Sequence, residues 1–164
     1  MRSGDYARWK AHSAMMRHKL GLAADAKPWT GRRGVTCGGY RLTERQADVL
    51  DVAWASRRSM MPENTTSDQL RENWWANLSQ AVQRKPWSEV VHTTCRSGIE
   101  YSFQADTILT GFAQMQILGH PQNFANSEDF SSRELYELAG EGYSIPICSL
   151  FLHAFFCNPH APWW

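Results

Sequence analysis

Of the 164 residues, 43% are hydrophobic and 20% are charged, which is the composition of one globular domain and excludes collagen-like, coiled-coil and wholly disordered chains. The 17 basic and 16 acidic residues nearly balance, but they are unevenly spread. The first 45 residues hold ten basic and three acidic residues, a net charge of +7, whereas the segment from Ser97 onward holds one and seven, a net charge of −6. A basic N-terminal third predicts contact with a polyanion or an acidic partner.

The chain shows neither a secretory signal nor a membrane-spanning segment. The N-terminus lacks an apolar stretch, and the most apolar segment, Ile145 to Cys157, is too short to cross a bilayer. None of the four cysteines stands in CxxC spacing. We therefore expect an intracellular protein with reduced thiols and no contact with a membrane.

Helical patterns dominate the N-terminal half. Residues 5–22 have the spacing of a basic amphipathic helix that ends at Gly21, and residues 23–40 are rich in glycine and predict a loop. A capping box of Thr43 and Gln46 begins a second helix, which is expected to reach Arg57. Residues 59–67 resemble a linker, and residues 68–83 suit either a helix or an extended segment.

The C-terminal half mixes strand and helix signals. Two β-prone runs, 90–95 and 99–103, flank Ser97-Gly98 and predict a hairpin. Thr110 is expected to cap a short helix that ends at Gly119. A capping box of Ser131 and Glu134 predicts a helix that ends at Gly140, and a last apolar helix begins near Pro146. The fold class expected is α+β, mainly helical with a small β-hairpin.

Two short motifs in the last third resemble the carboxyl-terminal end of the DNA (cytosine-5) methyltransferases. In that family a helix of the form L-T-x-x-E-x-x-x-L-x-G-F/Y-P precedes a final motif, L-Y-x-x-x-G-N-S-V-x-V-P, and another helix. Leu109-Thr110 and the run Leu118 to Pro121 match the first motif, and Leu135-Tyr136, Gly140 and Ile145-Pro146 match the second. The resemblance covers about residues 78–157 and implies the C-terminal part of a methyltransferase-like architecture.

The resemblance also implies a division of the chain and a cofactor site. Residues 1–76 take the place of the variable target-recognition region, residues 77–157 that of the C-terminal region, and residues 158–164 form a tail. Gly140, Glu141 and Gly142 correspond to the wall that binds S-adenosylmethionine. Glu141 stands where the family commonly has Asn, and its carboxylate could accept from the ammonium group of the cofactor. In the alternative interpretation Gly140 is a helix C-cap and Gly142 a turn residue.

The catalytic parts of the family are missing from the sequence. These enzymes attack C6 of a flipped cytosine with a cysteine thiolate and hold N3 with a glutamic acid. The family's Pro-Cys dipeptide, its Glu-Asn-Val tripeptide and its glycine-rich cofactor loop are all absent from residues 1–164. We expect no catalytic residue in this chain, no methyltransferase activity for the chain alone, and S-adenosylmethionine binding only together with a catalytic half.

DNA is the partner that the resemblance implies, and its contact is expected to be weak. If the resemblance holds, the protein acts on DNA methylation in the nucleus. The candidate phosphate contacts are basic residues of the first helix and the following loop, namely Arg8, Lys10, Arg17, Lys19, Arg32 and Arg33. The same residues are also consistent with a solvated helix face and loop. The alternative function is a stand-alone, non-catalytic module that binds a protein or a nucleic acid.

Two further groups of residues have the side-chain types of reactive sites. Cys148, His153, Cys157 and His160 are zinc-ligand types, but a spacing of five turns Cys148 and His153 about 140° apart on a helix. His92 and Cys95 fall on opposite faces of a strand, which argues against a nucleophile pair. We therefore expect no metal site and no cysteine-histidine enzyme.

Overall fold

The chain divides into two compact units in the computed structural model, which describes residues 3–32, 36–37, 40–92, 98–121, 130–142, 148–150 and 152. The N-terminal unit comprises Met1–Thr93 and Gly98–Ile108, and the C-terminal unit comprises Thr94–Ser97 and Leu109–Trp164. The α+β class is confirmed. Within the described ranges, no helix is both long and apolar enough to cross a membrane.

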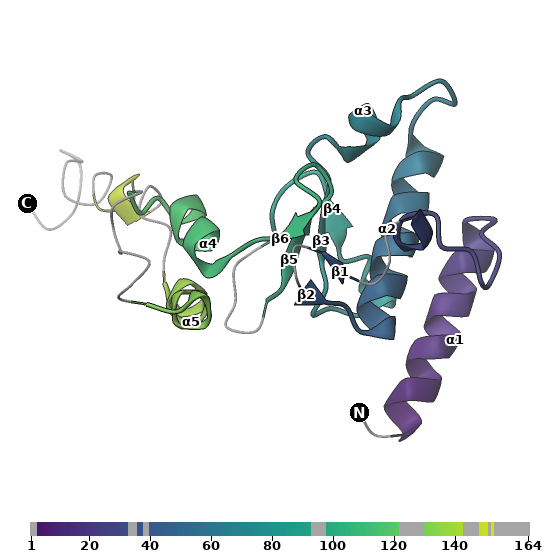
Figure 1. Ribbon diagram of the computed structural model, residues 1–164, viewed down its shortest axis with the longest axis horizontal. Coiled ribbons are helices and arrows are strands. Elements are labelled where there is room, and N and C mark those ends of the chain that lie inside the picture. The colour runs from purple at the N-terminus through teal and green to yellow at the C-terminus, as the bar shows by residue number, and fades with distance from the viewer. Residues whose placement is uncertain are drawn as a thin grey trace, which may run out of the picture. The chain divides into compact units, whose positions relative to one another are not determined.

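Helices α1 (Ser3–Lys19) and α2 (Glu44–Met60) are the two longest elements that the structure describes in the N-terminal unit, and they contact each other (Figure 1). The chain leaves α1 through Gly21, whose φ of +64° suits glycine and confirms the predicted stop. The predicted capping box is also present, because Thr43 accepts from the backbone of Gln46 and the Gln46 side chain accepts from that of Thr43. Helix α1 is therefore followed by a glycine that adopts a positive φ, and α2 begins at a residue whose side chain caps a free backbone N–H group.

A small antiparallel sheet packs beside α2 in the order β4-β3-β5-β6. Its strands are β3 (Trp75–Asn77), β4 (Trp87–Ser88), β5 (Glu100–Ser102) and β6 (Thr107–Ile108). A separate pair, β1 (Thr36–Cys37) and β2 (Tyr40–Arg41), lies in the segment predicted as a loop. The remaining elements of this unit are short helices, α3 (Ser67–Arg71), η1 (Thr30–Arg32) and η2 (Val82–Arg84).

The predicted hairpin between residues 90–95 and 99–103 is wrong. Strand β5 already has a partner on each side, β3 on one and β6 on the other, so no edge is open to residues 90–92. The hairpin that does form joins β5 to β6, and its turn places Asp106 at a φ of +53°. Residues 93–97 lie outside the described residues. Long-range pairing with β3 thus replaced the local pairing that the sequence favoured.

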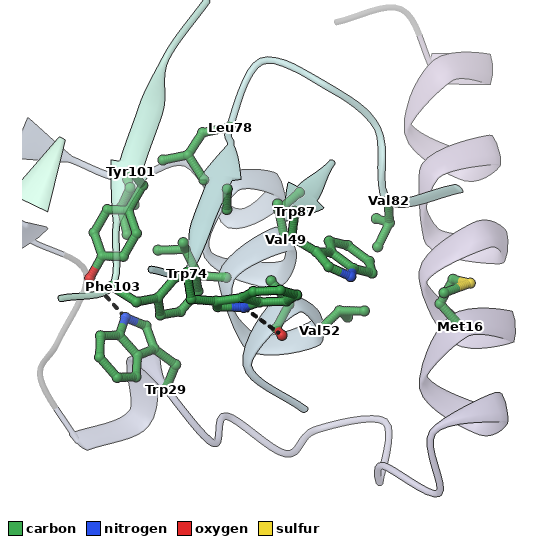
Figure 2. Packing of buried hydrophobic residues seen from close by; sticks show 14 of the residues in the cluster. Met16, Trp29, Val49, Val52, Trp74, Leu78, Val82, Trp87, Tyr101 and Phe103 are labelled. Carbon is green, nitrogen blue, oxygen red and sulfur yellow. Dashed lines mark hydrogen bonds between the residues drawn. The ribbon is translucent and has the colours of Figure 1, made fainter. Parts of the chain in front are cut away.

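The core of the N-terminal unit is rich in aromatic side chains contributed by helices and sheet alike (Figure 2). Trp29 lies against Phe103 with ring centroids 4.9 Å apart, and its indole donates to the Tyr101 hydroxyl at 2.9 Å. Trp74 donates to the carbonyl oxygen of Ala53 in α2 at 3.2 Å. Both of these buried indole N–H groups have an acceptor, so the rings supply apolar area without an unpaired donor.

The C-terminal unit is built on a pair of packed helices, α4 (Gly111–Ile117) and α5 (Ser132–Glu141). Thr110 caps α4, and Ser131 with Glu134 forms the predicted capping box of α5. Gly119, at a φ of +92°, follows α4 as expected. The small core between the helices consists of Met115, Leu118, Leu135 and Ala139 with Phe112 beside it.

Two expected borders differ from the structure. Helix α5 does not end at Gly140 but continues to Glu141, and its C-cap is Gly142 at a φ of −81°. The helical backbone at Gly140 needs no glycine, because the hydrogen bonds of the last turn continue past it. The border expected at residue 76 falls inside β3, which pairs with strands that follow it in the chain, so the compact units divide at Ile108 instead. The predicted tail 158–164 and most of the last apolar helix lie outside the described residues.

We predict that Gly111→Ala destabilises the C-terminal unit by about 1–3 kcal/mol, the usual effect of overpacking. A Cβ at Gly111 would lie 2.2 Å from the backbone oxygen of Ser132 and 2.7 Å from the nitrogen of Tyr136. Hydrogen exchange of the α5 amides should accelerate in this variant. Gly4→Ala, where a Cβ meets nothing within 4 Å, is the control, and unchanged α5 protection in Gly111→Ala would contradict the packing described.

Candidate functional site

Arg8 and Lys19 are two of the predicted DNA contacts that the structure leaves exposed on α1. They are eleven residues apart, about three helical turns, so they lie on the same side of the helix. Neither side chain has an ion-pair partner among the residues that the structure describes. Two unpaired cations about 16 Å apart along one helix face, at 1.5 Å per residue, suit contacts with separate phosphates.

Lys10 lies on another side of α1, facing α2. Its ammonium group pairs with the Glu44 carboxylate and sits 4.5 Å from the centroid of the Trp9 ring. The hydrogen bond to Glu44 raises the pKa of Lys10, and the same bond lowers the pKa of Glu44. The charge of Lys10 is therefore balanced within the protein, unlike the charges of Arg8 and Lys19.

Arg17 is buried and joins three segments of the N-terminal unit. Its Nε donates to Asp48 Oδ1 at 2.9 Å, and its Nη2 is 2.7 Å from the same oxygen. Its Nη1 donates to the carbonyl oxygens of Ala23 and Ala26 at 3.2 and 2.7 Å. Only 6% of the residue is exposed, so the structure places Arg17 in the interior rather than on a DNA-binding surface.

Two acidic residues that were not predicted as functional, Asp48 and Asp51, lie one turn apart on the buried face of α2. Asp51 accepts from the backbone of Trp29 and Thr30 at 2.9 and 2.8 Å, and from the Thr30 hydroxyl at 2.7 Å. Burial raises the pKa of Asp51 despite these hydrogen bonds. Acidic residues beside Val49 and Val52, within an apolar stripe, were the signal in the sequence that such anchors exist.

A groove of about 910 Å³ runs between α1, α2 and the segment 24–31. Its charged lining consists of Lys10, Arg17, Asp25, Lys27, Glu44, Asp48 and Asp51, three cations and four acids. The excess of carboxylates opposes a phosphate backbone in this groove. The side of α1 that carries Arg8 and Lys19 lies outside this groove. Arg32 is the last residue of η1, but its side chain and all of Arg33 lie outside the described residues.

The predicted cofactor residues lie at the C-terminal end of α5. Gly140 is part of the helix, Glu141 is exposed in its last turn, and Gly142 donates its N–H to the carbonyl oxygen of Ala139 at 3.3 Å. A Cβ at Gly142 would lie 3.4 Å from Leu118, so the C-cap touches α4. Of the three, Glu141 alone presents a side-chain polar group, and a carboxylate is suited to the ammonium end of S-adenosylmethionine.

The remaining reactive residues form no metal site in the described part of the chain. No group of three His, Cys, Asp or Glu side chains is placed there to hold an ion. Cys148 is a half-buried thiol, while His153, Cys157 and His160 lie outside the description. His92 contacts Glu100, with Nδ1 3.0 Å from Oε2, and Cys95 is outside the description as well.

No family model, curated protein or solved structure matches this chain. The function must therefore be inferred from the motifs, the exposed charges and the packing described above.

We predict that Asp51 makes stability fall as pH rises above the ordinary carboxyl value of 3.8. Because the folded pKa is raised, the protonated form favours folding, and that contribution is lost as pH passes through the folded pKa. The difference in unfolding free energy, wild type minus Asp51→Asn, should decline with pH at no more than about 1.4 kcal/mol per unit for one proton. Urea unfolding from about pH 3.5 upward, just below the ordinary carboxyl pKa, measures it. A difference that stays flat or grows would contradict the raised pKa.

Proposed function

We propose that the chain is the C-terminal part of a DNA (cytosine-5) methyltransferase-like protein, in which it contributes DNA contact and part of the S-adenosylmethionine site. It lacks the catalytic half, so it supplies binding surface rather than the reacting thiolate. When bound, S-adenosylmethionine supplies the methyl group, and the role left to this chain is to hold the cofactor and the DNA in place.

The observation that carries the proposal is the contact between the two motifs. The Tyr136 hydroxyl donates to the carbonyl oxygen of Leu109, which links the second motif to the start of the first. Leu118 and Leu135, one from each motif, are buried in the same cluster. Residues matched on sequence alone, from the consecutive elements α4 and α5 and their ends, thus meet in one small core. Such packing supports a common origin of the two motifs in one architecture.

The exposed charges support the two binding roles. Arg8 and Lys19 leave a cationic side of α1 free for phosphates, as the basic N-terminal third suggested. Glu141 offers a carboxylate at the end of α5, where the family has its cofactor wall. The rest of the cofactor's contacts belong to the catalytic half, since Gly140 and Gly142 offer only backbone.

A stand-alone interaction module is the second candidate function. The N-terminal unit has its own core of fifteen buried hydrophobic residues, and the helices α2 and α3 carry complete capping boxes. A unit with a hydrophobic core of this size can bury its apolar side chains without a catalytic half. In that case the surface of α1 binds a polyanion without any link to methyl transfer.

Methyl transfer tests the proposal directly. We predict that the chain alone transfers no label from S-adenosylmethionine to duplex DNA, and that a catalytic half of the family supplied in trans restores transfer. In that reconstituted complex Glu141→Ala should weaken S-adenosylmethionine binding by about tenfold, the value of one charge-assisted hydrogen bond. Isothermal titration calorimetry measures the affinity. Glu137→Ala, one turn earlier on α5 and paired with Arg133, is the matched control.

Three results would count against this proposal. Label on cytosine with the chain alone would show that the thiolate and its acid partner are present after all. Equal cofactor affinity of the wild type and Glu141→Ala would remove Glu141 from the site, and failure of every catalytic half to restore transfer would favour the interaction module.

DNA binding should depend on Arg8 and Lys19. We predict that replacing both with alanine weakens binding equally across sequences and makes the slope of log K against log salt shallower by up to about 1.8, or about 0.9 for each phosphate that the protein no longer neutralises. Fluorescence anisotropy of a labelled duplex between about 50 and 200 mM salt, the range in which such binding weakens most visibly, measures the slope. Arg58→Ala with Arg133→Ala removes the same charge elsewhere, and a slope that changes equally in both doubles would reject the α1 placement.

A further inference from the structure

A second pocket in the N-terminal unit, of about 820 Å³, has a buried arginine at its wall. It lies where the C-terminal end of α2, the segment 61–65, the end of α3 and residues 89–90 come together. Neither the methyltransferase motifs nor the exposed cations of α1 take part in it. Its ligand is therefore a question separate from the proposed function.

Arg57 of α2 is held in one position at this pocket. It is 7% exposed, and its guanidinium carbon lies 4.8 Å from the centroid of the Trp74 ring. Trp74 is itself fixed by its hydrogen bond to Ala53. The Arg57 Nη1 pairs with the Glu89 carboxylate, and Nη2 makes only a long contact of 3.4 Å with the carbonyl oxygen of Glu72. Its Nε is buried and has no hydrogen-bond partner among the residues that the structure describes.

This guanidinium is preorganised but incompletely satisfied. Arginine stays charged at all ordinary pH values, and a buried N–H without an acceptor is unfavourable. A bidentate carboxylate would supply acceptors for two of its N–H groups, whereas the ion pair with Glu89 runs through Nη1. An incoming carboxylate with better geometry can thus compete with Glu89.

Glu89 belongs to the surface rather than to the core. Its side chain is 67% exposed, against 9% for Arg57, so the carboxylate reaches the buried cation from solvent. An exposed ion-pair partner contributes little stability and keeps its side-chain freedom when released. Displacement of Glu89 therefore opens a path from solvent to Arg57 at small cost.

The remaining lining selects the charge and the hydrogen bonding of the ligand. The charged residues of the lining are Arg57, Glu72 and Glu89, which together carry one net negative charge. When Glu89 is displaced, the charges of Arg57 and Glu72 cancel. A bound monoanion then restores one net negative charge, whereas a dianion adds a second. The amides of Asn64 and Asn73 also line the pocket, and their side chains have no partner among the described residues. Amide groups offer both donors and acceptors, which suits peptide-like groups beside the carboxylate.

We infer that this pocket binds a carboxylate monoanion, which replaces the Glu89 carboxylate on Arg57 while Asn64 and Asn73 bond to the groups next to it. A small organic acid and the free carboxyl end of a peptide share this chemistry. The volume of about 820 Å³ leaves room for several atoms beyond the carboxylate. Arg57 is the recognising residue, and Glu89 is the competitor that limits affinity.

Nuclear magnetic resonance titration of the full chain tests the inference at the site itself. The signals observed are the Arg57 Nε–H and the Trp74 indole N–H. The probes are acetate, N-acetyl-glycyl-glycine with a free carboxylate, the same dipeptide as its carboxamide, and inorganic phosphate. The variants are Glu89→Gln, which removes the competitor, and Glu63→Gln, which removes the same charge from an exposed residue outside the pocket lining.

We expect the dipeptide acid to shift both signals saturably and to bind Glu89→Gln about tenfold more tightly than the wild type or Glu63→Gln, as for one charge-assisted hydrogen bond gained. Adding Arg57→Lys to Glu89→Gln should abolish the gain, because lysine has no planar fork. Tighter binding of the dipeptide than of acetate would identify a peptide end. Equal binding would identify a small organic acid and would contradict the hydrogen bonds from Asn64 and Asn73.

Three outcomes would overturn the inference. They are equal binding of acid and carboxamide, phosphate binding at least as tightly as the dipeptide acid, and no shift of either signal in Glu89→Gln. The indole signals of Trp9 and Trp29 report folding in every variant, since both rings are buried in the core away from the pocket. None of these outcomes depends on methyl transfer or on DNA binding, so the two proposals fail separately.

Discussion

The buried ion pair of Arg17 and Asp48 is the constraint on which the N-terminal unit depends. Arg17 bonds at once to α2 and to two carbonyls of the loop that follows α1, so it determines how the helix is rotated. Rotation in turn decides which cations are exposed. Because Arg17 faces inward, Arg8 and Lys19 face solvent on another side of α1. A buried pair of this kind is costly to break, since removing either partner strands a charge in the interior.

Helix α2 carries both the buried acidic residues and the buried arginine of the second pocket. Its N-terminal half carries Asp48 and Asp51, which satisfy α1 and η1, and its C-terminal half carries Arg57, which lies over Trp74. The acids are saturated by donors of the chain itself. Arg57 is not, because its Nε–H has no acceptor in the described part of the chain. The contrast explains why the acids are best understood as anchors and the arginine as a binding group.

The C-terminal unit depends on close backbone approach rather than on buried charge. Gly111 lets α4 touch the first turn of α5, and Tyr136 closes the contact by donating to Leu109. Among the described residues, Met115, Leu118, Leu135 and Ala139 are buried between the two helices.

The sequence alone determined the features that are local. Capping residues such as Thr43, Thr110 and Ser131 and the stops at Gly21 and Gly119 were predicted correctly, because each depends on contacts within a few residues. Tertiary structure decided the rest. Strand β5 pairs with β3 and β6 rather than with residues 90–92, and Arg17 is buried among distant partners. Pairing and burial are set by competition among segments far apart in the chain, which no local pattern records.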